Sequence, residues 1–127
     1  MDGMPDIDDF YDLPVLDADW VVRDMGDDAE SYREVASMFL KDLPVLRATL
    51  ARGARSSSAA LISVIHEVAN SLGVIGARRG TARVRLAERR LREGAQIDLL
   101  WVEQLAVEAL ALAEEALLAW MSRPPGP

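Results

Sequence analysis

The sequence predicts an all-α fold, an antiparallel four-helix bundle with a short extra N-terminal helix. Half of the 127 residues are hydrophobic and 6% are aromatic, and the abundance of Ala and Leu suits helices better than sheets. No segment alternates apolar and polar residues as a half-buried strand does, and we find no internal repeat. Four long segments instead repeat apolar residues every three or four positions. Short loops join them, which favours antiparallel neighbours in one domain.

The first two expected helices begin at acidic capping residues. A short helix is expected from about 17 to 25, with Gly26 as its stop. A longer helix is expected from about 28 to 53, beginning after a pair of aspartates. Pro44 lies inside its apolar pattern, so we expect a kink or a break near 40–44.

Three more helices follow. The serine run at 56–58 caps a third helix that extends to about 75. A fourth is expected over 77–93, ended by a glycine, and a fifth over 98–121, capped by Asp98. Residues 15–121 then form the helical domain. It is preceded by an acidic segment (1–14), expected to be a flexible leader or a loosely docked arm, and followed by a flexible tail (122–127).

Composition and charge exclude several classes of protein. The chain has no cysteine and one histidine, which argues against a disulfide framework and an intrinsic metal site. Its net charge of −7 argues against nucleic acid as the main partner. No secretory signal is visible, and no apolar run is expected to cross a bilayer; the longest candidate, 104–121, is interrupted by glutamates. We therefore expect a cytoplasmic protein that binds no membrane.

Charge is also unevenly distributed. Residues 1–30 hold eleven of the 21 acids, whereas 78–92 hold seven of the 14 bases, all arginine. These arginines are interpreted as the solvated face of the fourth helix, pairing with Glu88, Glu93 and the acidic leader. Binding of an acidic partner or of nucleic acid is the alternative.

The single histidine, His66, lies on the polar side of the third helix. At about 100° per residue, its direction is roughly 140° from the mean of the apolar positions. Its own face carries mostly very small residues: Ala59, Ile62, Ser63, Asn70, Gly73 and Ala77. Such a surface lets another protein approach the imidazole closely, although a lone histidine is more often an ordinary surface residue.

Residues 27–53 carry an acidic cap, a Phe-Leu pair, an Asp-x-Pro and spaced leucines. In this they resemble the second helix of the histidine-containing phosphotransfer (HPt) domain of bacterial two-component phosphorelays, and the resemblance covers residues 15–94. The phosphoacceptor signature of the family then follows, with His66 at the phosphoacceptor position. The residues at its signature positions are His66, Val68, Ala69, Asn70, Ser71, Gly76 and Ala77. Of these, Ser71, Gly76 and Ala77 match the family residues outright.

The chain departs from the HPt pattern at several positions. The family lysine near the phosphoryl group is Ala69 here, and the family glycine is Asn70. In the fourth helix, Gly80 and Arg83 stand where the family usually has leucine. These departures leave the expected fold intact, but they remove a charge that would steady the phosphoryl group.

The resemblance implies a phosphorelay function. A receiver-domain aspartyl phosphate would pass its phosphoryl group to a ring nitrogen of His66, Nε2 being expected, and another receiver would accept it. No cofactor of its own is expected, since the receiver would supply Mg²⁺. A response-regulator receiver domain would be the partner, with a hybrid sensor kinase as a further candidate. A monomer is expected, with a dimer as the alternative.

Other residues receive expected roles around His66. Asn70, one turn along, either donates to the phosphoryl oxygens or is simply solvated. Arg78 and Arg79 are the candidates for replacing the missing lysine, whereas Glu67 is expected to be a solvated neighbour. The expected receiver-docking positions are Ala59, Ile62, Ser63, Ala69, Gly73 and Ala77.

Two other functions remain open. The stretch "HEVANSL" is similar to the H-box of sensor histidine kinases, in which the acid matching Glu67 assists proton removal. No ATP-binding motifs accompany it, so this alternative is a dimeric kinase-like phosphotransferase without an ATP domain. An apolar stripe left over on the last helix would suit such a dimer. The second alternative is a non-catalytic helical adaptor that binds receiver domains.

Overall fold

The structure, a computed structural model, describes residues 10–123 of the chain. These residues form five α-helices and no strand, so the all-α prediction is confirmed. The helices are α1 (Ala18–Asp24), α2 (Ala29–Ala54), α3 (Ser58–Ile75), α4 (Arg78–Arg92) and α5 (Leu99–Met121). The outer parts of the predicted leader and tail, 1–9 and 124–127, lie outside the described residues.

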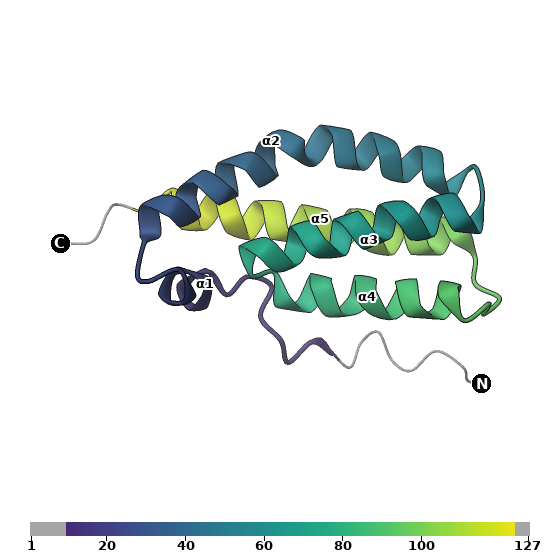
Figure 1. Cartoon of the computed structure of the whole chain (residues 1–127), viewed down its shortest axis with the longest axis horizontal. Helices are drawn as coiled ribbons and strands as arrows, with labels where there is room; N and C mark the ends of the chain where they lie inside the picture. Colours follow the sequence, from purple (N-terminus) through teal and green to yellow (C-terminus); the bar gives the residue numbers. More distant parts are fainter. Residues whose placement is uncertain (1–9, 124–127) are drawn as a thin grey trace.

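The four long helices lie side by side along the long axis of the molecule, with the short α1 near one end (Figure 1). The helix α3 packs against α2, α4 and α5, and α1 packs against α2. Fully buried aliphatic side chains from all four long helices form one core. Each long helix therefore buries its apolar stripe against its neighbours, as its sequence periodicity requires.

The predicted helix starts are confirmed where a side chain caps the helix. Asp28, Ser57 and Asp98 each precede a helix and accept a hydrogen bond from a backbone N–H of its first turn, at 3.0–3.1 Å. Each bond satisfies an N–H that has no partner within the helix. Asp17 precedes α1 without such a bond.

Of the kink or break predicted near 40–44 in α2, the structure shows a bend and no break. Pro44 lies inside a continuous helix of 26 residues, and Figure 1 shows α2 as one bent helix. Proline cannot donate to the carbonyl four residues earlier, so the helix can bend there. Tertiary packing keeps it continuous, because Leu43 and Leu46 beside the proline are both buried in the core.

Residues 10–14, expected to belong to a flexible leader or a loosely docked arm, are held against α4. The Arg79 side chain donates to the carbonyl oxygens of Leu13 (2.9 Å) and Tyr11 (3.0 Å), and its backbone N–H donates to Pro14 (3.0 Å). Its guanidinium also lies 5.0 Å from the centre of the Tyr11 ring. The ordered domain therefore begins before residue 15.

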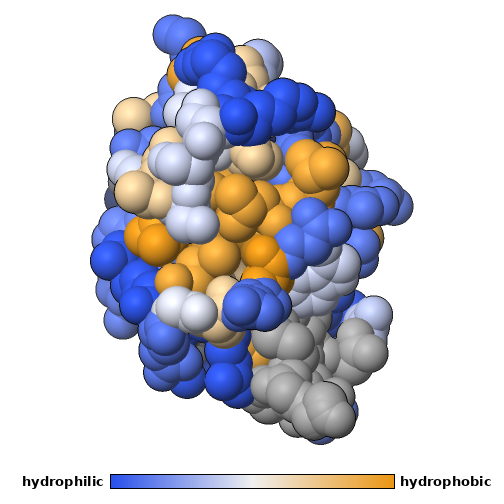
Figure 2. All heavy atoms as spheres, turned by 90° about the vertical axis from the view of Figure 1, so that its right-hand side faces the viewer, coloured by the Kyte–Doolittle hydropathy of each residue, from blue (hydrophilic) through white to orange (hydrophobic). Residues whose placement is uncertain are grey.

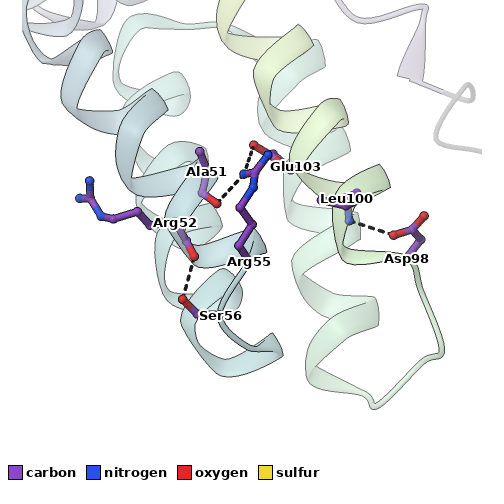
Figure 3. A network of polar contacts seen from close by, with 7 residues as sticks. All are labelled: Ala51, Arg52, Arg55, Ser56, Asp98, Leu100 and Glu103. Atoms are coloured by element: carbon purple, nitrogen blue, oxygen red, sulfur yellow. Dashed lines mark hydrogen bonds and ion pairs between the residues drawn. The ribbon is translucent and has the colours of Figure 1, made fainter.

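Polar contacts join the C-terminal end of α2 to the N-terminal part of α5. The Arg55 guanidinium donates to the Ala51 carbonyl (2.8 Å) and lies 3.4 Å from a Glu103 carboxylate oxygen on α5 (Figure 3). Since the Arg55 side chain is largely exposed, the ion pair contributes little stability. Its guanidinium nevertheless links the end of α2 to the first turns of α5.

One helix corrects an expectation about apolar segments. Among the described residues, α3 is long and apolar enough, by length and composition, to cross a membrane. From the sequence, the longest candidate for such a segment was 104–121. Seven of its residues are buried against other helices, and the core helix of a soluble protein passes the same test.

Tyr32 links α2 to the end of α3. Its ring is fully buried and its hydroxyl donates to the Ile75 carbonyl at 2.6 Å. That carbonyl belongs to the last turn of α3 and lacks a helical partner. Burial raises the pKa of Tyr32 from 10.0 to about 12, with a smaller contribution from the charge of Asp19.

Replacing Tyr32 by Phe should therefore lower the free energy of unfolding by about 1–2 kcal/mol at neutral pH, because the buried carbonyl loses its donor. The raised pKa of Tyr32 also makes the free energy of unfolding depend on pH in the alkaline range. The stability that depends on the protonated phenol is complete below pH 10 and is lost as pH rises through about 12. Urea unfolding from pH 7 to 11.5 should show the alkaline decline in the wild type and a flatter profile in Tyr32→Phe. Identical alkaline slopes would contradict this assignment.

Candidate functional site

His66 lies in the middle of α3 and is exposed. Its side chain keeps 54% of its accessible surface, while Ile65 and Val68 on the other side of the helix are fully buried. The predicted orientation, away from the apolar stripe, is therefore confirmed. An imidazole on the surface of a well-packed helix is accessible to another protein and is carried by a stiff backbone.

Glu88 of α4 fixes the orientation of the imidazole. One carboxylate oxygen of Glu88 (Oε2) lies 2.8 Å from His66 Nδ1. A carboxylate oxygen only accepts hydrogen bonds, so Nδ1 carries the proton. In the neutral ring, Nε2 is then the nitrogen with the free lone pair. This contact selects the tautomer and limits rotation of the ring.

Arg92 completes the polar cluster. It stands one helical turn after Glu88, and its Nε (2.9 Å) and Nη2 (2.8 Å) both donate to Glu88 Oε2. The Glu88 side chain is 11% exposed, whereas that of Arg92 is 54% exposed. The largely buried carboxylate is thus neutralised by a cation at the surface. His66, Glu88 and Arg92 are referred to below as the His66 cluster.

Most of the small residues predicted around His66 do lie on the surface. Ala59, Ser63, Asn70 and Gly73 are exposed, and Ile62 is half-buried. Asn70 makes no hydrogen bond through its side chain to any residue between 10 and 123, which leaves its amide available one turn from His66.

Two predicted docking positions are wrong. Ala69 and Ala77 are each 1% exposed and belong to the core. Ala69 is buried because α3 packs against three other helices, so its buried arc is wider than the apolar stripe indicates. Ala77 does not continue the face of α3, because the helix ends at Ile75 and the chain turns at Gly76.

The two arginines predicted to support the phosphoryl group, Arg78 and Arg79, lie away from His66, so this prediction is wrong. Both stand at the start of α4, about 15 Å along the helix from Glu88 at 1.5 Å per residue. Arg78 lies 3.6 Å from the Asp17 carboxylate, and Arg79 binds the 10–14 segment. Neither is therefore close to His66.

The other arginines of α4 are only partly a solvated face. Arg83 is buried, 3.4 Å from Glu108 of α5, whereas Arg85 and Arg89 are exposed. Arg90 pairs with Glu93 at 3.9 Å. The predicted pairings with Glu88 and Glu93 are thus present.

An apolar surface lies at the end of the molecule where α4 leads into α5. Figure 2 shows this end, with apolar residues at its centre and polar residues around them. A shallow groove there is lined by Ser58, Leu91, Ile97 and Leu99, together with residues 94–96 and 98. Ile62 stands between Ser58 and His66 at one-turn intervals along α3. The groove therefore lies within about 12 Å of His66 along the helix axis.

The roles of Glu88 and Arg92 at His66 were not predicted from the sequence. Glu88 was noted as a pairing partner for arginine, but its register against α3 was unknown. The periodicity of α4 gives a usable signal, because Glu88 follows Val84 by one turn and precedes Leu91 by three residues, next to the apolar face.

Comparisons with protein-family models, with curated proteins and with solved structures found no match for the chain. Within residues 10–123, no group of three or more His, Cys, Asp or Glu side chains is arranged to hold a metal ion.

Proposed function

We propose that this protein is a histidine phosphotransfer protein in which His66 carries the phosphoryl group. The observation that carries the proposal is the contact between His66 Nδ1 and Glu88, which leaves Nε2 of an exposed imidazole as the nucleophile. The proposal includes the fold, an antiparallel four-helix bundle of α2–α5 with α1 as the extra N-terminal helix, as in HPt domains.

The reaction requires little from the protein beyond alignment. The Nε2 lone pair attacks the phosphorus of a receiver aspartyl phosphate, a P–N bond forms, and the P–O bond breaks to release the aspartate carboxylate. No proton has to leave Nε2, because the ring proton is on Nδ1. The positive charge that develops on the ring is stabilised by Glu88 at 2.8 Å. Phosphoryl transfer through a loose transition state depends mainly on such positioning and charge neutralisation.

The partner is proposed to be a response-regulator receiver domain that brings its own Mg²⁺, in the cytoplasm. The exposed face of Ala59, Ile62, Ser63 and Gly73 gives this domain close access to His66. The apolar groove at the end of α4 offers burial of apolar surface next to that face.

The proposal is tested by phosphoryl transfer from a panel of phosphorylated receiver domains in the presence of Mg²⁺. Wild-type protein should acquire an acid-labile, base-stable label, and His66→Gln should acquire none. Because His66 is exposed, the variant should remain folded, which circular dichroism checks. Absence of label on the wild type with every receiver would overturn the proposal.

The same experiment separates the alternatives. A receiver that binds tightly but transfers nothing indicates the non-catalytic adaptor. Labelling by ATP alone indicates a kinase-like activity. In that activity Glu67, which is exposed and makes no hydrogen bond or ion pair with His66, would have to act as the base.

A further inference from the structure

The phosphoryl group on His66 would need a cation close by. A phosphorylated side chain carries a charge of about −1.5 to −2 near pH 7. It would form on the imidazole that already contacts the Glu88 carboxylate, whose charge repels it. Ala69, about one turn along α3, is uncharged and buried. A group on another helix must therefore offset this charge.

Arg92 has the geometry for this role. Its Nη2 and His66 Nδ1 both lie 2.8 Å from the same Glu88 oxygen, so these two nitrogen atoms are at most about 5.6 Å apart, and Nε2 lies across the ring from Nδ1. Only Nε and Nη2 are used in the contact with Glu88. The remaining N–H groups of a guanidinium with five donors are directed elsewhere, and the side chain is 54% exposed.

We propose that Arg92 is the phosphoryl-binding cation of this protein, poised beside His66 by its contact with Glu88. When Nε2 carries the phosphoryl group, the guanidinium donates to the phosphoryl oxygens with N–H groups that Glu88 does not use. This inference rests on the proposed function and adds a binding residue to it.

Arg85 is the matched control. It stands one turn before Glu88 on the same helix and is also exposed. Its Nη2 lies 3.8 Å from the position that a Cβ on Gly73 would take. Gly73 is two turns of α3 beyond His66, about 10 Å along the axis. The two arginines thus carry the same charge on either side of Glu88, and only Arg92 extends toward His66.

The experiment uses phosphoramidate, a small phosphoryl donor, so that no receiver residue contributes to the rate. The P–N bond of the donor breaks with loss of ammonia, and a P–N bond to His66 forms. Arg92→Gln should lower the rate constant of labelling by about 5- to 20-fold, as expected for loss of a charge-assisted contact. Arg85→Gln should change it less than twofold.

A double-mutant cycle with Glu88→Gln decides whether Arg92 acts directly. If Arg92 contacts the phosphoryl group, Arg92→Gln should still lower the rate at least threefold in the Glu88→Gln background. Loss of the effect in that background would show that Arg92 acts only through Glu88 and would overturn the inference. Equal effects of Arg92→Gln and Arg85→Gln would overturn it too. Absence of label on the wild type, with this donor and with receivers, would overturn the proposed function as well.

Discussion

Glu88→Ala is expected to slow phosphoryl transfer to His66 by roughly 10- to 100-fold, by analogy with the loss found when the hydrogen-bond partner that orients a metal-bound histidine is removed. Without Glu88 the ring rotates freely and Nε2 carries the proton for much of the time, so fewer encounters present an aligned lone pair. Rates of transfer from one receiver domain, measured by rapid quench, test this.

Glu88→Gln separates orientation from charge. The glutamine oxygen still accepts the Nδ1 hydrogen bond, whereas the negative charge is lost. If orientation is the main contribution, Glu88→Gln should stay within about threefold of the wild type while Glu88→Ala is slow. If the carboxylate acts mainly by repelling the incoming phosphoryl group, both variants will be faster than the wild type, which would contradict the assigned role.

Gly76→Ala is expected to destabilise the fold by about 2–4 kcal/mol. Gly76 ends α3 with φ +84, a left-handed conformation that costs an alanine about 1 kcal/mol. An added Cβ would also lie 2.7 Å from Val21 Cγ2 and 2.9 Å from the Asp17 carbonyl oxygen. Because Asp17 donates its N–H to the Gly76 carbonyl at 2.8 Å, α1 would have to move away from the end of α3.

Gly94→Ala provides the control for the backbone contribution. Gly94 has φ +79, but nothing lies within 4 Å of its added Cβ. It should therefore cost only about 1 kcal/mol. Urea unfolding of both variants gives the difference, which measures the close packing of α1 on α3. Equal losses of stability would contradict that packing.

Local signals made the helices predictable. Asp28, Ser57, Asp98 and Gly76 each act within one turn of the chain, so the boundaries of α2, α3 and α5 follow from the sequence alone. The orientation of His66 was also predictable, because it depends only on the periodicity of one helix. At Pro44 the sequence left a kink and a break open, and the packing of the neighbouring leucines explains why the helix bends without breaking.

The surroundings of His66 were less predictable because they depend on how helices pack. Glu88 meets His66 only through the register of α4 against α3, and one sequence does not give that register. Arg78 and Arg79 were chosen because they follow the third helix closely in the chain. Their contacts with Asp17 and the 10–14 segment come from residues some 60 positions away.

We expect the His66 ring to present Nε2 to the phosphoryl donor, with Nδ1 turned inward to Glu88. After chemical phosphorylation with phosphoramidate, ¹⁵N and ³¹P NMR of the intact protein identify the phosphorylated nitrogen directly. We expect one phosphohistidine, with the phosphoryl group bonded at Nε2 and a protonated Nδ1 that still donates a hydrogen bond to the Glu88 carboxylate. A phosphoryl group on Nδ1, or a ring that takes none, would contradict it.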